Sequence, residues 1–180
     1  MKVDIAELAQ LHNNGPELTP VGDCYRTSLA SLLGFSSPDK VPHFVQMAHD
    51  AFGKEGLAPE PMWAREWMRD LGYDLAAIGL DDCKAWCKET EMDLYGLATV
   101  PGHNAKWHCV VWDVRASNIR WDPSTCTSRE LDEDLISEGF LEIACLKYEP
   151  GPETMTRQPN AWPAAMPVKP LVDPWVIGLD

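Results

Sequence analysis

The feature that most constrains the fold is a change of hydrophobic periodicity near Gly72. Before this glycine, apolar residues recur at the spacing of amphipathic helices, whereas after it most apolar runs are short and typical of strands. Helices are predicted over residues 23–33, 41–53 and 60–72, then 81–91 and 128–139. Strands are predicted over residues 74–80, 95–100, 107–114, 118–122 and 140–149. Helices that precede an antiparallel sheet predict an α+β domain.

The first predicted helix carries residues that suit helix ends. Asp23 is a favourable N-cap, and Gly34 stands where a left-handed glycine commonly ends a helix. Trp63 and Trp67 lie four residues apart in the third predicted helix. Because this spacing places side chains on one face, we predict that these tryptophans, like the stripe of the first helix, form core. That stripe consists of Tyr25, Leu29, Leu32 and Leu33.

The net charge and the N-terminal sequence restrict both function and compartment. The 180 residues carry a formal net charge of -13, which argues against a sequence-independent grip on nucleic acid and against an anionic membrane surface. Asp4 and Glu7 interrupt the first apolar stretch, so no signal peptide is predicted. No apolar run reaches the roughly 20 residues of a membrane span. We therefore expect a cytoplasmic protein whose six cysteines are free thiols.

A change of composition divides the chain into a domain, residues 1–148, and a tail, residues 149–180. Seven of the 15 prolines lie in residues 150–180, which excludes a helix or a central strand there. The tail is predicted to be extended, and three roles stay open for it. It packs on its own domain through Trp162 and Trp175, reaches a partner, or enters the candidate site as an internal inhibitor.

Cys24 opens the first predicted helix, directly after its N-cap. The first N–H groups of a helix have no partner within it, and the helix dipole favours negative charge there. Both effects lower the pKa of a thiol toward that of a reactive thiolate. The same N–H can donate to an oxyanion beside the sulfur. Cys24 is therefore either a nucleophile or a small core residue, and the Asp23 carboxylate opposes a thiolate unless it turns back to cap the helix.

His108 and Asp122 lie on consecutive predicted strands, 107–114 and 118–122. Alternation places His108 and Val110 on one apolar face, which we expect to point at the helices. An odd-length loop centred on Ala116 places Asp122 opposite Val110 on that same face, where its carboxylate can accept from the imidazole. A two-residue loop turns Asp122 to the other face. A histidine satisfied within the core is the alternative.

The order of these residues resembles the papain-like cysteine peptidase superfamily, in which a cysteine opens the main helix and the histidine and acid come from the following sheet. Within it, the chain is most similar to small bacterial and bacteriophage proteins of unassigned function. The resemblance spans about residues 18–125 and implies a papain-like fold with a Cys24–His108–Asp122 triad, but it supplies no substrate. The motifs that carry it are Gly22-Asp23-Cys24, Ala30-Ser31-Leu32-Leu33-Gly34, Val41-Pro42-His43-Phe44, His108-Cys109-Val110-Val111-Trp112-Asp113 and Asp122-Pro123.

One departure from the family concerns the oxyanion hole. Papain-like enzymes place a Gln a few residues before the nucleophile, whereas residues 15–24 contain none. Loss of one such donor typically lowers the rate by about 10²–10³. The candidate replacements and substrate contacts are Asp23, Thr19, Asn14, His103, Trp107 and Trp121. Of these, His103 is also the alternative base, and the two tryptophans either shield the His–Asp pair or belong to the core.

A zinc site is the competing interpretation of the remaining cysteines. Cys83 and Cys87 lie four residues apart on a predicted helix, and His103, His108 and Cys109 follow. This spacing is not a standard structural zinc pattern, and alternation aims His108 and Cys109 at opposite faces. We therefore expect neither a metal nor another cofactor.

The predicted function is a cysteine hydrolase that cleaves an amide or isopeptide bond in a protein or peptide substrate through a thioester. Two alternatives stay open. One is a catalytically weak or inactive papain-like fold that binds a protein partner, suggested by the missing Gln and the Trp- and Pro-rich tail. The other is acyl transfer to an amine, as in transglutaminases, which uses the same triad.

Overall fold

The computed structural model describes residues 5–11, 22–52, 60–102, 107–125, 127–136 and 139–147. Three predicted site residues, Asn14, Thr19 and His103, lie outside these ranges, as do residues 148–180. The predictions for these residues and for the Pro-rich tail therefore stay predictions.

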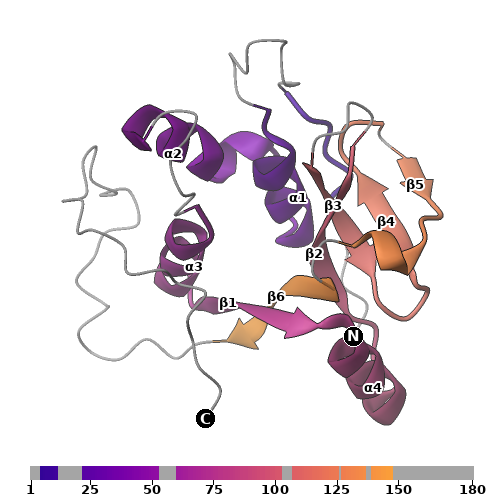
Figure 1. Cartoon of the computed structure of the whole chain (residues 1–180). Helices are drawn as coiled ribbons and strands as arrows, with labels where there is room; N and C mark the ends of the chain where they lie inside the picture. Colours follow the sequence, from indigo (N-terminus) through magenta and orange to yellow (C-terminus); the bar gives the residue numbers. More distant parts are fainter. Residues whose placement is uncertain are drawn as a thin grey trace.

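Helices and an antiparallel sheet make up the described fold, as predicted for an α+β protein (Figure 1). The helices are α1 Cys24–Leu32, α2 Phe44–Phe52, α3 Glu60–Asp70 and α4 Leu80–Thr90, with 3-10 turns η1 Pro38–Lys40 and η2 Glu133–Leu135. The strands are β1 Tyr73–Gly79, β2 Tyr95–Pro101, β3 Trp107–Asp113, β4 Asn118–Asp122, β5 Thr127–Arg129 and β6 Phe140–Lys147. The six strands form one sheet in the order β1-β6-β2-β3-β4-β5, and all neighbouring pairs are antiparallel.

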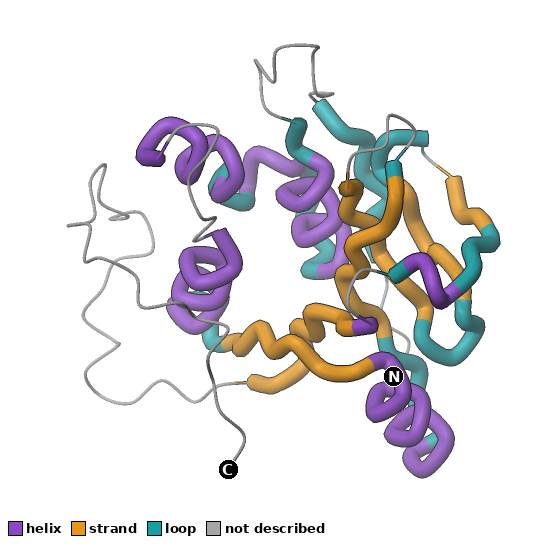
Figure 2. The backbone as a smooth tube through the Cα atoms, viewed as in Figure 1, coloured by secondary structure: helices purple, strands orange, loops and turns teal. Residues whose placement is uncertain are grey.

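Two apolar clusters lie on opposite faces of this sheet. Helix α1 contacts β3 and β2, and α3 contacts β1 and α2, which gathers the first three helices on one side (Figure 2). The cluster on that side includes Leu29, Trp67 and Val111. The second cluster joins Cys83 and other residues of α4 to alternate residues of β3. Because both faces are covered, both sets of alternating side chains in β3 are apolar.

The face of β3 that carries Val110 was expected to point at the helices of the N-terminal half, but it points at α4. Val110, Trp112 and Val114 pack with α4, whereas α1, which begins at Cys24, packs on the face that carries Cys109 and Val111. A strand buried on both faces shows no polar side from which the sequence could tell the two directions apart.

The ends of α1 agree with the sequence prediction. Leu29 and Leu32 are buried in the core with Tyr25 and Leu33 packed against them, and Gly34 follows with a φ of 69°. Glycine readily adopts the left-handed conformation at this position, because it has no Cβ. The predicted stripe of α3 is also confirmed, since Trp67 is buried and Trp63 packs beside it.

The acidic helix predicted over residues 128–139 is wrong. Strand β5 covers Thr127–Arg129, and η2 is one turn of 3-10 helix over Glu133–Leu135. Asp132 explains the short turn, because its carboxylate accepts the Asp134 N–H and so stabilises a local turn. The segment has few apolar residues, so no amphipathic stripe stabilises a longer helix.

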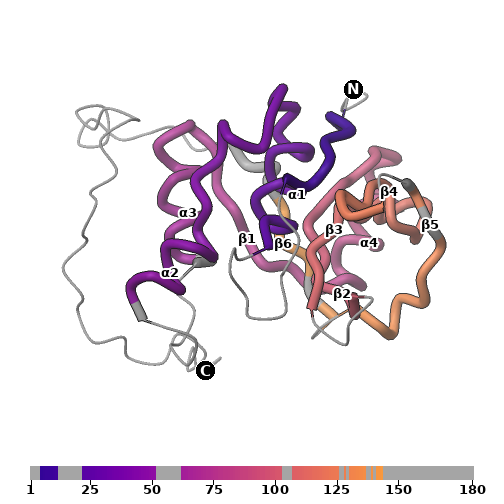
Figure 3. The backbone as a smooth tube through the Cα atoms, turned by 90° about the horizontal axis from the view of Figure 1, so that it is seen from above, coloured from indigo at the N-terminus to yellow at the C-terminus, as the bar shows by residue number. Residues whose placement is uncertain are grey.

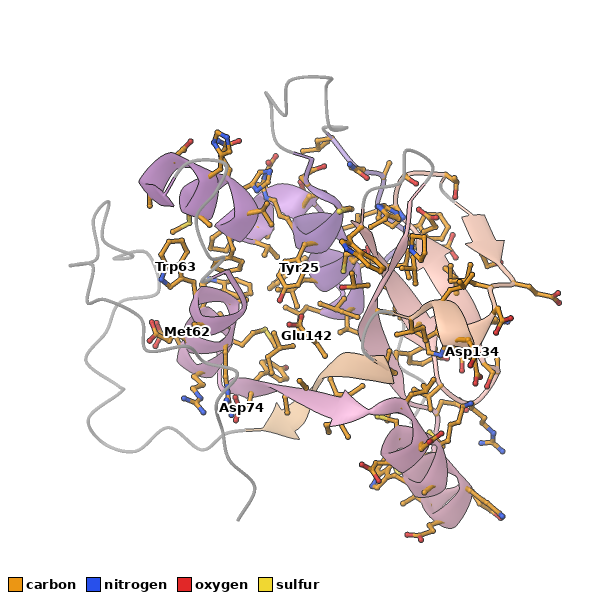
Figure 4. The ribbon with its side chains drawn as sticks, viewed as in Figure 1. Tyr25, Met62, Trp63, Asp74, Asp134 and Glu142 are labelled. Atoms are coloured by element: carbon orange, nitrogen blue, oxygen red, sulfur yellow. The ribbon has the colours of Figure 1, made fainter. Side chains whose placement is uncertain are left out.

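Strand β6 lies close to both β2 and α1. A Cβ on Gly96 of β2 would lie 2.5 Å from Ile143 Cδ1 and 3.2 Å from the Glu142 carbonyl oxygen, so a side chain at this position would force Ile143 to move. The Tyr25 hydroxyl donates to Glu142 Oε2 over 2.7 Å, and the two side chains point toward each other between α1 and β6 (Figure 4). In the described ranges, no helix has both the length and the apolar character to cross a membrane.

Candidate active site

Cys24 is the first residue of α1, as the capping pattern predicts. Helix α1 lies across β3, where the Ser28 hydroxyl donates to the Cys109 carbonyl oxygen over 2.9 Å. This buried bond fixes the first turns of the helix on the strand that carries His108. Cys24 is partly exposed as a residue, and it lies at a helix N-terminus.

The role predicted for Asp23 as a side-chain cap is wrong. Asp23 occupies the N-cap position, but within the described ranges its side chain makes no capping bond to α1. Its Oδ2 instead accepts the Leu11 N–H over 3.3 Å, and its carbonyl accepts the Thr27 N–H over 2.8 Å. The residue is fully buried. Asp23 therefore joins the N-terminal segment to α1 and is not placed to touch a substrate.

The β3–β4 connection differs from the odd-length loop that the triad hypothesis required. Asp113 pairs with Asn118, so the turn contains four residues. Asp113 Oδ1 accepts the Ala116 N–H over 2.9 Å, which stabilises this turn. Ser117 closes the turn in a left-handed conformation, with a φ of 49°. Continued without interruption, this even register would turn Asp122 away from the face of His108.

A β-bulge restores the required register. Trp112 pairs with Ile119, but the next residue, Val111, pairs with Trp121, so Arg120 is an extra residue in β4. Continuing by one residue places Asp122 opposite Val110, on the face of His108. The predicted juxtaposition is therefore present, although an inserted residue produces it and not the length of the loop.

His108 and Asp122 form a close pair at the end of the sheet. Their Nε2 and Oδ1 atoms lie 2.8 Å apart, and the side chains are 11% and 0% exposed. Burial lowers the pKa of His108, but the hydrogen bond to Asp122 and the hydrogen bond and charge of Cys24 outweigh it and raise that pKa to about 9. The pKa of Asp122 is lowered: burial raises it, but the bonds from His108 and Ser124 outweigh burial. The pair is thus an imidazolium beside a carboxylate at neutral pH.

The imidazole also joins Asp122 to Cys24. Cys24 both hydrogen-bonds His108 and acts on it electrostatically. Because Nε2 faces Asp122, Nδ1 is the ring nitrogen left for Cys24. The three residues predicted from the sequence are therefore brought together around one imidazole ring, with the acid and the thiol on different nitrogens.

Ser124 is a residue of the candidate site that the sequence did not predict. Its N–H and its hydroxyl both donate to Asp122 Oδ1, over 2.9 and 2.7 Å. An acid followed two residues later by a serine, with Pro123 between them, is a common turn pattern and is the signal that could have found it. Ser124 fixes the carboxylate oxygen that binds His108.

Gln10 is a second residue that the sequence reasoning missed. The N-terminal segment, residues 5–11, lies beside α1 (Figure 3), and the Ala6 N–H donates to the Ser31 carbonyl. The Gln10 N–H donates to the Pro123 carbonyl over 3.0 Å, directly after Asp122, and the next residue, Leu11, binds Asp23. Gln10 therefore lies between the end of β4 and the start of α1, with its carboxamide oxygen buried. It is the only glutamine before Cys24 in the chain.

The two candidate tryptophans have different environments. Trp121 is buried in the core, and its indole N–H donates to the Leu8 carbonyl over 2.8 Å, so it holds the N-terminal segment. Trp107 is 62% exposed. Alternation along β3 places Trp107 on the same face as Cys109, toward α1. Trp107 is therefore an exposed ring on the α1 side of β3, on the face opposite to that of His108 and Asp122.

The cysteines, the groups considered for a metal site and His43 have the following environments. The described cysteines Cys24, Cys83, Cys87 and Cys109 are free thiols, as predicted. Among the residues that the structure describes, no three His, Cys, Asp or Glu side chains are grouped so as to hold a metal ion. His43 Nδ1 accepts the Gln46 N–H over 3.2 Å at the start of α2, so this side chain caps that helix.

Comparison with known proteins gives no family for this chain: no family model, no curated protein and no solved structure matches it.

Proposed function

We propose that this chain is a cysteine hydrolase with a papain-like arrangement, acting on an amide or isopeptide bond of a protein or peptide. The observation that carries the proposal is the His108–Asp122 pair, 2.8 Å apart, whose imidazole also interacts with the thiol at the start of α1. A nucleophile, a base and a group that orients the base are the parts that covalent acyl transfer requires.

In the proposed reaction, the Cys24 thiolate attacks the substrate carbonyl carbon, and the carbonyl electron pair moves to oxygen. When the tetrahedral intermediate collapses, the C–N bond breaks, and His108 gives its Nδ1 proton to the leaving amine. The neutral imidazole then removes a proton from water, which attacks the thioester and releases Cys24. Asp122 holds the ring through Nε2 and stabilises its charged form.

Two donors are proposed for the oxyanion. The Cys24 N–H lies at the start of α1, where the helix leaves its first N–H groups without a helical partner. We assign the second donor to the Gln10 carboxamide, since its backbone is fixed beside Asp122 by the bond to Pro123. If this assignment holds, Gln10→Ala lowers kcat by about 10²–10³ and leaves the alkylation rate of Cys24 unchanged, because alkylation forms no oxyanion.

The exposed Trp107 ring supports a peptide as substrate. It is 62% exposed on the face of β3 toward α1, so a bound chain can lie against it. Trp107→Ala is expected to raise KM for a peptide substrate with little change in kcat. Trp86→Ala is the matched control, because Trp86 is also exposed, at 41%, but lies on α4.

The decisive experiment has two readouts on the full chain. The first is the rate at which iodoacetamide labels Cys24 at neutral pH, in wild type, His108→Ala and Asp122→Ala. The second is formation of an acetyl thioester on Cys24 from 4-nitrophenyl acetate, located by peptide mass spectrometry, and its later hydrolysis. His49→Ala serves as the histidine control, since His49 lies on α2.

We expect Cys24 to be labelled much faster than an ordinary exposed thiol, and the two site variants to lose that advantage while His49→Ala keeps it. Ordinary labelling that does not depend on His108 would reject the hydrolase and favour a binding protein with the same fold. A thioester that persists in water but transfers its acyl group to an added amine would favour the transferase alternative.

A further inference from the structure

Cys109 is a buried thiol that the proposed reaction does not use. It is 5% exposed and directly follows His108 in β3. Its carbonyl accepts the Ser28 hydroxyl over 2.9 Å, and Ser28 also hydrogen-bonds its thiol. The strand thus presents a second thiol to the first turns of α1.

Helix geometry places Cys24 over the same point of β3. Cys24 and Ser28 are four residues apart, so they lie on one face of α1, about 5–6 Å from each other. Ser28 contacts Cys109, His108 interacts with Cys24, and Cys24 packs against the cluster that contains Cys109. Cys24 is therefore held beside both His108 and Cys109 of β3.

Burial keeps the second thiol protonated at rest. Burial, with the charge of Cys24 as the next cause, raises the pKa of Cys109 well above its usual value. Cys109 is thus held in its neutral thiol form, because a second negative charge beside Cys24 would be unfavourable. Removing the charge from Cys24 removes one of the causes that keep Cys109 protonated.

From this juxtaposition we propose that Cys109 is the resolving thiol for Cys24: when a hydroperoxide oxidises Cys24, the two residues form a disulfide. The site thereby gains a modification that nothing in the hydrolytic reaction needs. The proposal shares only the nucleophilic thiolate of Cys24 with the proposed function and requires no acyl substrate.

The two steps balance. The Cys24 thiolate attacks one peroxide oxygen, the O–O bond breaks, and the departing oxygen takes the His108 proton, which gives a Cys24 sulfenic acid and water or an alcohol. The Cys109 sulfur then attacks the Cys24 sulfur, the S–O bond breaks, and the departing hydroxide combines with the Cys109 proton to give water. Peroxide is reduced and the two thiols are oxidised to one disulfide.

The disulfide would have a defined consequence for the site. It removes the nucleophile reversibly, because a thiol reductant restores both cysteines. It also prevents the sulfenic acid from advancing to the sulfinic acid, which is essentially irreversible. A chain without Cys109 should therefore lose Cys24 permanently under the same exposure to peroxide.

The test treats the full chain with about one equivalent of hydrogen peroxide, blocks the remaining thiols, and maps peptides without reduction. Wild type, Cys109→Ser, Cys109→Ala and Cys87→Ser are compared, with dimedone added to capture sulfenic acid. Cys87 is the matched control, because it is also 5% exposed and has a raised pKa. It belongs to α4, which lies on the other face of the sheet.

We expect a Cys24–Cys109 peptide in wild type and in Cys87→Ser. Both Cys109 variants should instead accumulate the dimedone adduct and then the sulfinic acid on Cys24, and dithiothreitol should restore iodoacetamide labelling only where the disulfide formed. Wild-type protein that gives the dimedone adduct on Cys24 without the disulfide overturns the proposal and leaves the hydrolase intact. If Cys24 reacts with neither peroxide nor iodoacetamide, both proposals fail, because both require a reactive Cys24 thiol.

Discussion

Replacing Asp122 by Asn tests the central pair of the site by removing one charge and almost no volume. Asp122 Oδ1 accepts one hydrogen bond from His108 Nε2, over 2.8 Å, and two from Ser124. An Asn carbonyl oxygen can accept the same three bonds. The substitution therefore isolates the charge of the carboxylate, which is one of the causes that hold the pKa of His108 at about 9.

The expected size and sign follow from linkage between protonation and folding. The rise of the His108 pKa from 6.5 to about 9 corresponds to about 3 kcal/mol, an upper limit because Cys24 contributes to it. Since the folded pKa is the higher one, this stabilisation is complete below about pH 6.5 and is lost as the pH rises through about 9. Asp122 has a lowered pKa, so its share is present above its unfolded pKa of 3.8 and is lost as the pH falls through the folded pKa. The pair therefore stabilises most between about pH 4 and 6.5.

Urea unfolding of wild type and Asp122→Asn at about pH 5.5 and about pH 10 measures this contribution. We expect Asp122→Asn to lower the free energy of unfolding by about 1–3 kcal/mol at the lower pH, with a smaller loss at the higher pH. Asp74→Asn is the control: Asp74, labelled in Figure 4, pairs with Arg65 and Arg69, which keep their charge over this range. An Asp122→Asn loss that is the same at both pH values would refute the reasoning.

Three further predictions concern neighbouring contacts. Ser124→Ala should lower kcat up to tenfold with KM unchanged and shift the alkaline limit of the pH–rate profile downward, and Ser124→Thr should restore both, since Ser124 holds Asp122 Oδ1. Gly96→Ala should destabilise the fold by about 1–3 kcal/mol in urea, because its Cβ would meet Ile143; an unchanged midpoint would contradict the close approach. Trp121→Phe should lose about 1 kcal/mol with its bond to Leu8 and increase hydrogen exchange in residues 5–11, and slow exchange there would count against this role.

Local patterns were sufficient to predict most elements of the fold. The helix ending at Gly34 and the stripe containing Leu29 follow from spacing along one segment, and they are confirmed. The acidic segment over residues 128–139 was predicted wrongly, because charge alone does not distinguish a short 3-10 turn from a helix. His108 and Asp122 were identified as partners from the parity of two neighbouring strands.

The sequence by itself determined which residue types stand at the ends of α1, β3 and β4, since capping and alternation are local properties. Only the tertiary structure decided how those ends meet. The bulge at Arg120 sets the face of Asp122, and pairing across a sheet depends on hydrogen bonds that neither strand specifies alone. Asp23 binds Leu11 and not its own helix, and Gln10 reaches Pro123 from the far end of the described chain, because a buried polar group takes the partner that packing brings to it.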